Sequence, residues 1–299
     1  MPTTDQLLEA TAPAGSVGAS PERRRPAPRA RWTRRNIGLL TLGLVLGVLT
    51  VLPLVIMVFG SFKPEAEVTA PTILPQEPTF ENYVYVFTEV PFLRYLLNSA
   101  FISAVITVLA LWFHSMAAYA LARLRFPGRE AIFLVIFSTL LVSLPVIMVP
   151  TFAVVRTLGM VDSYAGLIVP AIFNAFGIFL LRQFYLSIPA ELEEAALLDG
   201  AGYWRVYWSV ILPLSRPILS ALTVFFFLAN WNSFVWPLTI TSDPNLRTVQ
   251  VGIASFQLQY TGNWNYTLAA ATVAAVPMLA LFFFFQRHIV ESIKSAGFK

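Results

Sequence analysis

The sequence predicts an all-α integral membrane protein with six transmembrane helices, and three observations support this class. Of its 299 residues, 57% are hydrophobic and 12% are charged, whereas soluble domains average about 45–50% apolar and about 25% charged residues. Six apolar runs are each long enough to cross a hydrocarbon core of about 30 Å as a helix. The sequence has no cysteine and only two histidines, so we expect no disulfide framework and no metal site.

The first 36 residues differ in composition from the rest of the chain. They are rich in Pro, Ala, Ser and Arg and poor in large apolar side chains, which is typical of a disordered segment. We expect residues 1–36 to form a disordered, basic, cytoplasmic tail, and residues 37–299 to form one transmembrane domain. The apolar run after the tail is longer than the core of an export signal, so a twin-arginine signal is not favoured.

The first two spans are predicted at Ile37–Phe59 and Asn98–Ala122. Between them lies a polar loop, Lys63–Leu97, in which a short helix is expected over Phe80–Glu89. Small and polar residues recur along the second span at three- and four-residue steps, which favours close contact with other helices. His114 lies on this stripe and is expected to be neutral and bonded to a neighbouring helix, with a proton relay as the alternative.

Four further spans are predicted. The third carries two prolines and should be kinked, and a polar loop at Thr239–Tyr266 is expected to separate the last two. Three amides lie in or near the membrane interior, where an unpaired amide is costly: Asn174, Asn230 and Asn232. Each is expected either to form a hydrogen bond between helices or to be a candidate contact on a substrate pathway. The predicted spans are Ile132–Val155, Tyr164–Leu181, Ile218–Leu238 and Thr267–Gln286.

The distribution of charge predicts the orientation. With a cytoplasmic amino terminus, sixteen of the 20 Lys and Arg lie on the inside and four on the outside, so both termini should be cytoplasmic. Apart from His114, the six apolar runs contain no ionisable residue, which argues against the alternative of an ion-coupled carrier or channel. No lysine completes a phosphate-binding loop, so no nucleotide site is expected in this chain.

A polar segment, Ile188–Pro217, separates the fourth and fifth spans. A helix capped by Ser187 is expected to start there, with acidic residues near its positive end. Gly200 and Gly202 should end this helix, and a second helical piece is expected over Tyr203–Leu212. A helix lying on the membrane surface is the alternative, although such helices favour Lys and Arg, and four acidic residues precede the first Arg here.

Within this segment, Glu-Ala-Ala, three residues, Gly, and then Ile-Leu-Pro resemble the cytoplasmic EAA loop of importer-type ABC transporter permeases. Three further runs are similar to the second of two permease subunits in carbohydrate importers of the maltose type. These runs are NSAFISAVITVLALWFHSMAAYALARLRFPGR, FFFLANWNSFVWPL and PMLALFFFFQRHIVESIKSAGFK. Two positions depart from the pattern: Tyr207 replaces the usual Phe, and residues 291–293 replace a Gly-rich turn.

The resemblance implies a permease subunit, not itself an enzyme, that moves a sugar or polyol into the cytoplasm by alternating access. It also implies a bacterial-type cell membrane, a sister permease in a heterodimer, two ATPase subunits that carry ATP and Mg, and an extracytoplasmic solute-binding protein. No nucleic-acid partner is expected. Within residues 187–217 the resemblance assigns ATPase coupling to Glu194, Ala195, Ala196, Asp199, Gly200, Leu212 and Pro213.

Overall fold

The computed structural model describes residues 34–259 and 263–296, and these residues form helices and connecting turns without a strand. The chain divides into two units, residues 1–50 and 51–299. Helix α1 (Arg34–Gly60) begins in the first unit and continues into the second. Most of the predicted tail, residues 1–33, lies outside the described residues.

Four helical stretches in the described residues are long and apolar enough to cross a membrane. They are Gly38–Gly60 in α1, α3 (Phe92–Arg123), the stretch Tyr164–Ser187, and Trp264–Phe285 in α14 (Trp264–Ala296). Two bent helix pairs raise the number to six if each pair is one span. Each of the six predicted runs coincides with helical structure, while the number of spans is four to six.

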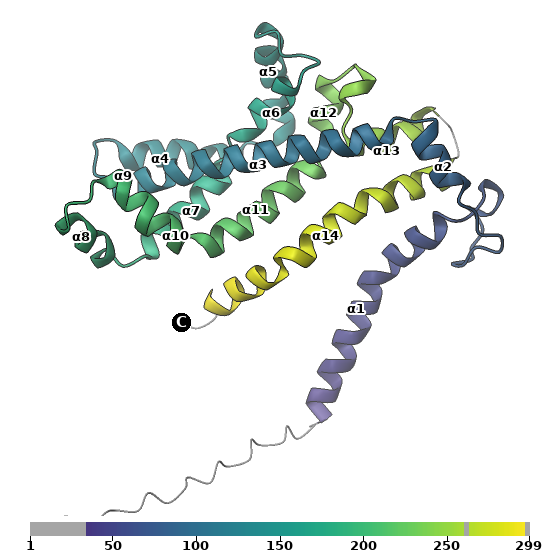
Figure 1. Cartoon of the computed structure of the whole chain (residues 1–299), viewed down its shortest axis with the longest axis horizontal. Helices are drawn as coiled ribbons and strands as arrows, with labels where there is room; N and C mark the ends of the chain where they lie inside the picture. The colour runs from purple at the N-terminus through teal and green to yellow at the C-terminus, as the bar shows by residue number, and fades with distance from the viewer. Residues whose placement is uncertain (1–33, 260–262, 297–299) are drawn as a thin grey trace, which may run out of the picture. The chain divides into compact units, whose positions relative to one another are not determined.

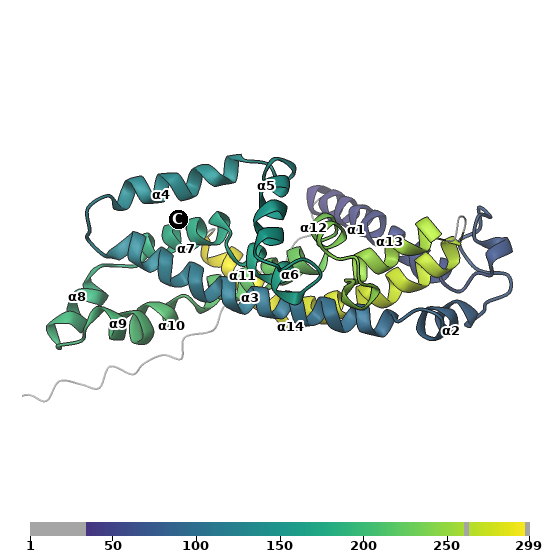
Figure 2. The same cartoon turned by 90° about the horizontal axis from the view of Figure 1, so that it is seen from above.

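The third predicted span is broken rather than only kinked. Helix α4 (Arg129–Ser138) and the short η3 (Thr139–Leu141) are followed by α5 (Leu144–Thr157). The pair is bent by 108° (Figure 2). Ser143 is extended at the bend, and Pro145 has no N–H with which to continue an α-helix from the preceding turn. The predicted kink is therefore present in an extreme form.

The fourth and fifth spans contain non-helical breaks that the sequence did not predict. Helix α6 (Tyr164–Ile172) is separated from α7 (Ala175–Ser187) by two residues. Helix α11 (Arg216–Trp231) ends before the predicted Leu238, and α12 (Val235–Ile240) follows after a short gap.

The prediction of a polar loop over Thr239–Tyr266 was wrong in part. This stretch contains η5 (Pro244–Leu246) and an eleven-residue helix, α13 (Val249–Gln259). Val249 and Phe256 of α13 are buried against other helices. Tertiary packing therefore stabilises a helix in a stretch whose polar composition had indicated a loop. The shorter elements before α3 are η2 (Glu65–Glu67) and α2 (Glu81–Thr88), which confirms the expected short helix.

Helix α3 is the centre of the fold, since it contacts α6, α7, α11 and α13 (Figures 1 and 2). His114 lies on α3 with no exposed surface, and its Nε2 accepts a hydrogen bond of 3.1 Å from the backbone N–H of Asn174. This contact confirms the predicted bond to a neighbouring helix. Gly177 makes room for it, because a Cβ there would lie 2.3 Å from His114 Nδ1 and 2.8 Å from the Phe226 ring.

Candidate functional site

The polar segment between α7 and α11 folds as a series of short helices (Figure 1). These are α8 (Glu191–Leu198), α9 (Tyr203–Val206), the π-helical η4 (Tyr207–Ile211) and α10 (Leu212–Leu214). The expected helix and second helical piece are both present.

The predicted capping of α8 by Ser187 was wrong. Ser187 is the last residue of α7, and its Oγ donates a hydrogen bond of 2.7 Å to the carbonyl of Phe184. Ile188 is extended, as expected for a residue that precedes proline, and this ends α7. Ala190 occupies the N-cap position of α8 without a side-chain hydrogen bond. Glu191, Glu193 and Glu194 lie in the first turn, as predicted.

The turn at Gly200 has the geometry that requires glycine. Its φ is +81°, in the left-handed region that L side chains rarely adopt. The N–H of Gly200 donates to the carbonyl of Leu197 and that of Ala201 to the carbonyl of Ala196, each at 3.0 Å. These two bonds form a Schellman motif that ends α8 and redirects the chain toward α9.

Helix α8 has an exposed face and an inner face. Glu194, Ala195 and Asp199 are exposed, and Leu198 is 89% exposed. On the inner face, Glu193 is buried, and Ala196 and Leu197 pack against the apolar cluster formed by α3, α7, η4 and α11. Of the other predicted coupling residues, Gly200 is exposed, whereas Leu212 and Pro213 of α10 are half-buried. The coupling role of the seven residues stays a prediction.

A groove of about 720 Å³ lies between α8 and the turn that joins α3 to α4. The turn contributes Arg125 to its lining and α4 contributes Arg129, while α8 contributes Glu193, Glu194 and Leu197. The groove thus has a basic wall and an acidic wall.

Arg123 lies in the same groove and joins three helices. Its Nε lies 2.8 Å from Glu193 Oε1, and its Nη2 donates hydrogen bonds to the backbone carbonyls of Tyr185 and Ile188. Burial raises the pKa of the Glu193 carboxyl, and the Arg123 charge opposes this shift in part. The pair is therefore a desolvated contact, in which each charge depends on the other.

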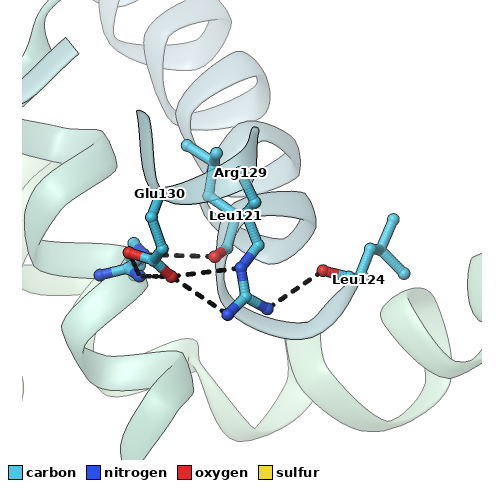
Figure 3. Close-up of polar contacts among 5 residues, drawn as sticks. Leu121, Leu124, Arg129 and Glu130 are labelled. Atoms are coloured by element: carbon cyan, nitrogen blue, oxygen red, sulfur yellow. Dashed lines mark hydrogen bonds and ion pairs between the residues drawn. The ribbon is translucent and has the colours of Figure 1, made fainter. Parts of the chain in front are cut away.

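A second ion-pair group lies nearby. Arg182 Nη2 donates to both oxygens of Glu130 at 2.9 Å, and its Nε donates to the carbonyl of Leu121. Arg129 contacts the same carboxylate and donates to the carbonyl of Leu124 (Figure 3). The predicted fourth span ended at Leu181, whereas α7 continues to Ser187 and so includes the buried Arg182.

The three candidate pathway amides lie at or beside the helix breaks. Asn174 precedes α7, and its Oδ1 accepts a bond of 2.8 Å from the N–H of Phe176. Asn230 donates to the carbonyl of Phe226 within its own helix. Asn232 donates to the carbonyl of Leu228 and accepts from Gln250 on α13 at 3.2 Å. Asn174 and Asn232 are exposed, and Asn230 is half-buried.

Comparison with known proteins identifies the family. Residues 115–295, which include α8 and both ion-pair groups, match the family described as binding-protein-dependent transport system inner membrane component. The chain belongs to this family. In the described part of this permease, no three His, Cys, Asp or Glu residues are grouped so that they could hold a metal ion.

Similar curated permeases cover nearly the whole chain. The arabinooligosaccharides transport system permease protein AraQ of Halalkalibacterium halodurans is 34% identical over 93% of this chain and 99% of its own. The sn-glycerol-3-phosphate transport system permease protein UgpE of Yersinia enterocolitica is 35% identical, over 84% and 93%. The diacetylchitobiose uptake system permease protein NgcG of Streptomyces coelicolor is 33% identical, over 84% and 85%.

A solved structure has a similar fold. A chain of a bacterial ABC transporter involved in the import of the acidic polysaccharide alginate superposes with a TM-score of 0.74 at 25% identity. The superposition covers 86% of this permease and 98% of that chain.

Sequence reasoning missed Arg123, Glu193 and Leu198 as candidate functional residues of this permease. The signal was present for Glu193, because residues 193, 196 and 197 follow the three- and four-residue spacing of one helix face. No such sequence signal exists for Arg123, because it lies far from α8 in the sequence and meets Glu193 only in the folded chain.

Proposed function

We propose that this permease is the transmembrane subunit of an ATP-driven importer that moves a sugar or polyol into the cytoplasm by alternating access. Its family membership supports a transport role that depends on a binding protein. The names of similar proteins support a carbohydrate-related solute, since they mention arabinooligosaccharides, diacetylchitobiose, alginate and glycerol phosphate. A mono-, di- or oligosaccharide or a polyol is therefore the substrate class.

The exposed face of α8 is the observation that carries this proposal. Leu198 is 89% exposed, and an apolar side chain at the tip of a short polar helix suits an anchor in a protein pocket. The exposed Glu194 is placed to meet a basic group on the same partner. That partner is an ATPase subunit, which holds ATP and Mg, and the positive charges of this region favour a cytoplasmic position for α8.

The complete assembly contains a sister permease, two ATPase subunits and an extracytoplasmic solute-binding protein in a cell membrane. The experiment is to purify this permease alone and with its partners, and to reconstitute both into vesicles. We expect the permease alone to hydrolyse no ATP, because no phosphate-binding loop is present. The complex should take up sugar only with ATP and without response to a protonophore. Proton-driven uptake by the permease alone would support the ion-coupled alternative and overturn the proposal.

The amides at the helix breaks are proposed to line the substrate pathway. Non-helical backbone at membrane depth is stable only where protein covers it or where it lines an aqueous cavity. Asn174 and Asn232 are exposed beside such breaks, and Asn230 is the second-last residue of α11, next to the break that follows that helix. Replacing each of the three by Ala should change the apparent sugar affinity in at least one case. If all three changes alter only the protein level, this part of the proposal fails.

A further inference from the structure

Two adjacent glutamates of α8 differ in their exposure to solvent. Glu194 is exposed, whereas the side chain of Glu193 is 10% exposed and lies against Arg123, whose side chain is 12% exposed. An exposed carboxylate can meet a partner subunit, but a buried one cannot. Glu193 therefore acts within this permease.

Arg123 connects Glu193 to the long helices. It is the last residue of α3, and its guanidinium also donates to the carbonyls of Tyr185 and Ile188, at the end of α7. The last carbonyls of a helix lack intrahelical donors, and a positive charge is favourable there. One side chain thus joins α3, α7 and α8.

The other contacts of α8 leave its direction less well fixed. Ala196 and Leu197 make apolar contacts with the cluster beneath α8, and such contacts have no preferred direction. A groove of about 720 Å³, which Glu193 and Leu197 also line, separates α8 from the α3–α4 turn. The guanidinium of Arg123 is held by its hydrogen bonds to the carbonyls of Tyr185 and Ile188, so the ion pair with Glu193 ties α8 to a charge whose position α3 and α7 fix.

We propose that Arg123 and Glu193 form the link through which a displacement of α8 by the ATPase is transmitted to α3 and α7. The inference rests on the proposed function and adds positioning residues to it. Docking depends on Glu194 and Leu198, whereas transmission depends on Arg123 and Glu193. Breaking the link should therefore leave ATPase subunits bound and active while less sugar is moved per ATP.

Glu193→Gln is the principal test, because glutamine keeps the shape of the side chain and removes its charge. Burial already disfavours the charged carboxylate, and the amide oxygen of glutamine can still face the guanidinium of Arg123. Arg123→Gln is the second variant. Arg125→Gln, an exposed arginine of the same groove, and Glu191→Gln on the outside of α8 are the matched controls.

The measurements are subunit content, ATPase rate and sugar uptake in reconstituted complexes matched for protein. We expect both principal variants to keep their ATPase subunits and to lose about fivefold or more in sugar moved per ATP, a typical size for coupling between sites. The double variant should lose no more of the sugar moved per ATP than either single variant, because the two single variants remove the same interaction. The controls should retain the wild-type ratio.

Three results would overturn the link: a normal ratio in both single variants, loss of ATPase subunits from Glu193→Gln, or losses that multiply in the double variant. Failure of the wild-type complex to move sugar would instead contradict the proposed function. The two failures are therefore distinguishable in one experiment.

Discussion

The two ends of helix α3 are held by different kinds of polar contact. At its last residues, near α8, lie all three ion pairs found in the described residues, each between an arginine and a glutamate. At its other end, near α2, the buried Asn98 donates to the carbonyls of Asn245 and Arg247 and accepts from the hydroxyl of Tyr164 at 2.8 Å. We refer to these regions as the α8 end and the α2 end.

The difference indicates that the two ends of α3 have different roles. A satisfied network of neutral hydrogen bonds makes a buried region rigid. Buried ion pairs add little net stability but are strongly sensitive to the loss of one partner, and they fix orientation. Substitutions at the α2 end should therefore change stability alone, while substitutions that break the Arg123–Glu193 pair at the α8 end should also change how the subunits work together.

The largest effect on transport is expected at Gly200. Gly200→Pro replaces a φ of +81° with one near −65° and removes the N–H that bonds to Leu197. Both changes prevent the turn that ends α8, so sugar uptake should fall by about tenfold or more, equivalent to about 1.4 kcal/mol or more of lost coupling. Membrane abundance should stay near normal, because insertion is decided by the spans. Immunoblotting and uptake in reconstituted complexes measure both quantities, and unchanged uptake would leave α8 as a surface helix only.

Glu194→Lys tests the charge on the exposed face of α8. A lysine there would repel a basic group of the ATPase, so association should weaken by about fivefold to tenfold with little change in permease abundance. Glu89→Lys, an equally exposed reversal at the α2 end, is the control and should leave association unchanged. The amount of ATPase subunit recovered with the tagged permease measures the effect. Equal recovery from both variants would contradict the docking role.

Arg182→Met tests the stability of the second ion-pair group. Arg182 has 8% of its side chain exposed and Glu130 58%, so the carboxylate can regain water when its partner is lost. We expect a loss of about 2–3 kcal/mol from the broken hydrogen bonds. Arg129→Met removes an exposed contact with the same carboxylate and should cost about 0.5 kcal/mol. Thermal unfolding of the purified complex compares the two, and equal losses would contradict the role of burial.

Asn98→Ala tests the neutral contacts of the α2 end. The change removes three hydrogen bonds and should lower the free energy of unfolding by about 2 kcal/mol. Arg94→Ala, which removes one exposed bond to Asn245, should cost about 0.5 kcal/mol. Neither variant should alter the sugar moved per ATP. A changed ratio in Asn98→Ala would show that the two ends do not divide stability and coupling.

The smallest effect is expected at Asp162, whose carboxylate accepts hydrogen bonds from the N–H groups of Ser242 and Asp243. These bonds lower the pKa of Asp162. Its stabilising effect should therefore be complete above the ordinary aspartate pKa and disappear as the pH falls through the lowered value. Asp162→Asn should lower the melting temperature slightly at neutral pH, and the difference from wild type should vanish in strong acid. A difference that grows in acid would contradict the assigned cause.

The sequence predicted the apolar helices and the turn at Gly200 because both follow from local composition and backbone preference. It did not predict α13, whose buried Val249 and Phe256 contact residues far away in the chain. The resemblance assigned ATPase coupling to Glu194, which stays a prediction. The sequence could not identify Arg123 as the partner of Glu193, because that contact depends on how α3 meets α8. Local signals thus located the segment, while its connection to the spans required the fold.

The position of Arg123 also has a consequence for biosynthesis. Arg123 precedes Tyr185 by 62 residues, and synthesis at about 5–20 residues per second makes the interval several seconds. During that time the charge has neither the carbonyls of α7 nor a carboxylate of α8, and it must remain hydrated. The end of α3 therefore stays at the water interface until α7 and α8 have been made. Arg123 then binds both of these newly made helices.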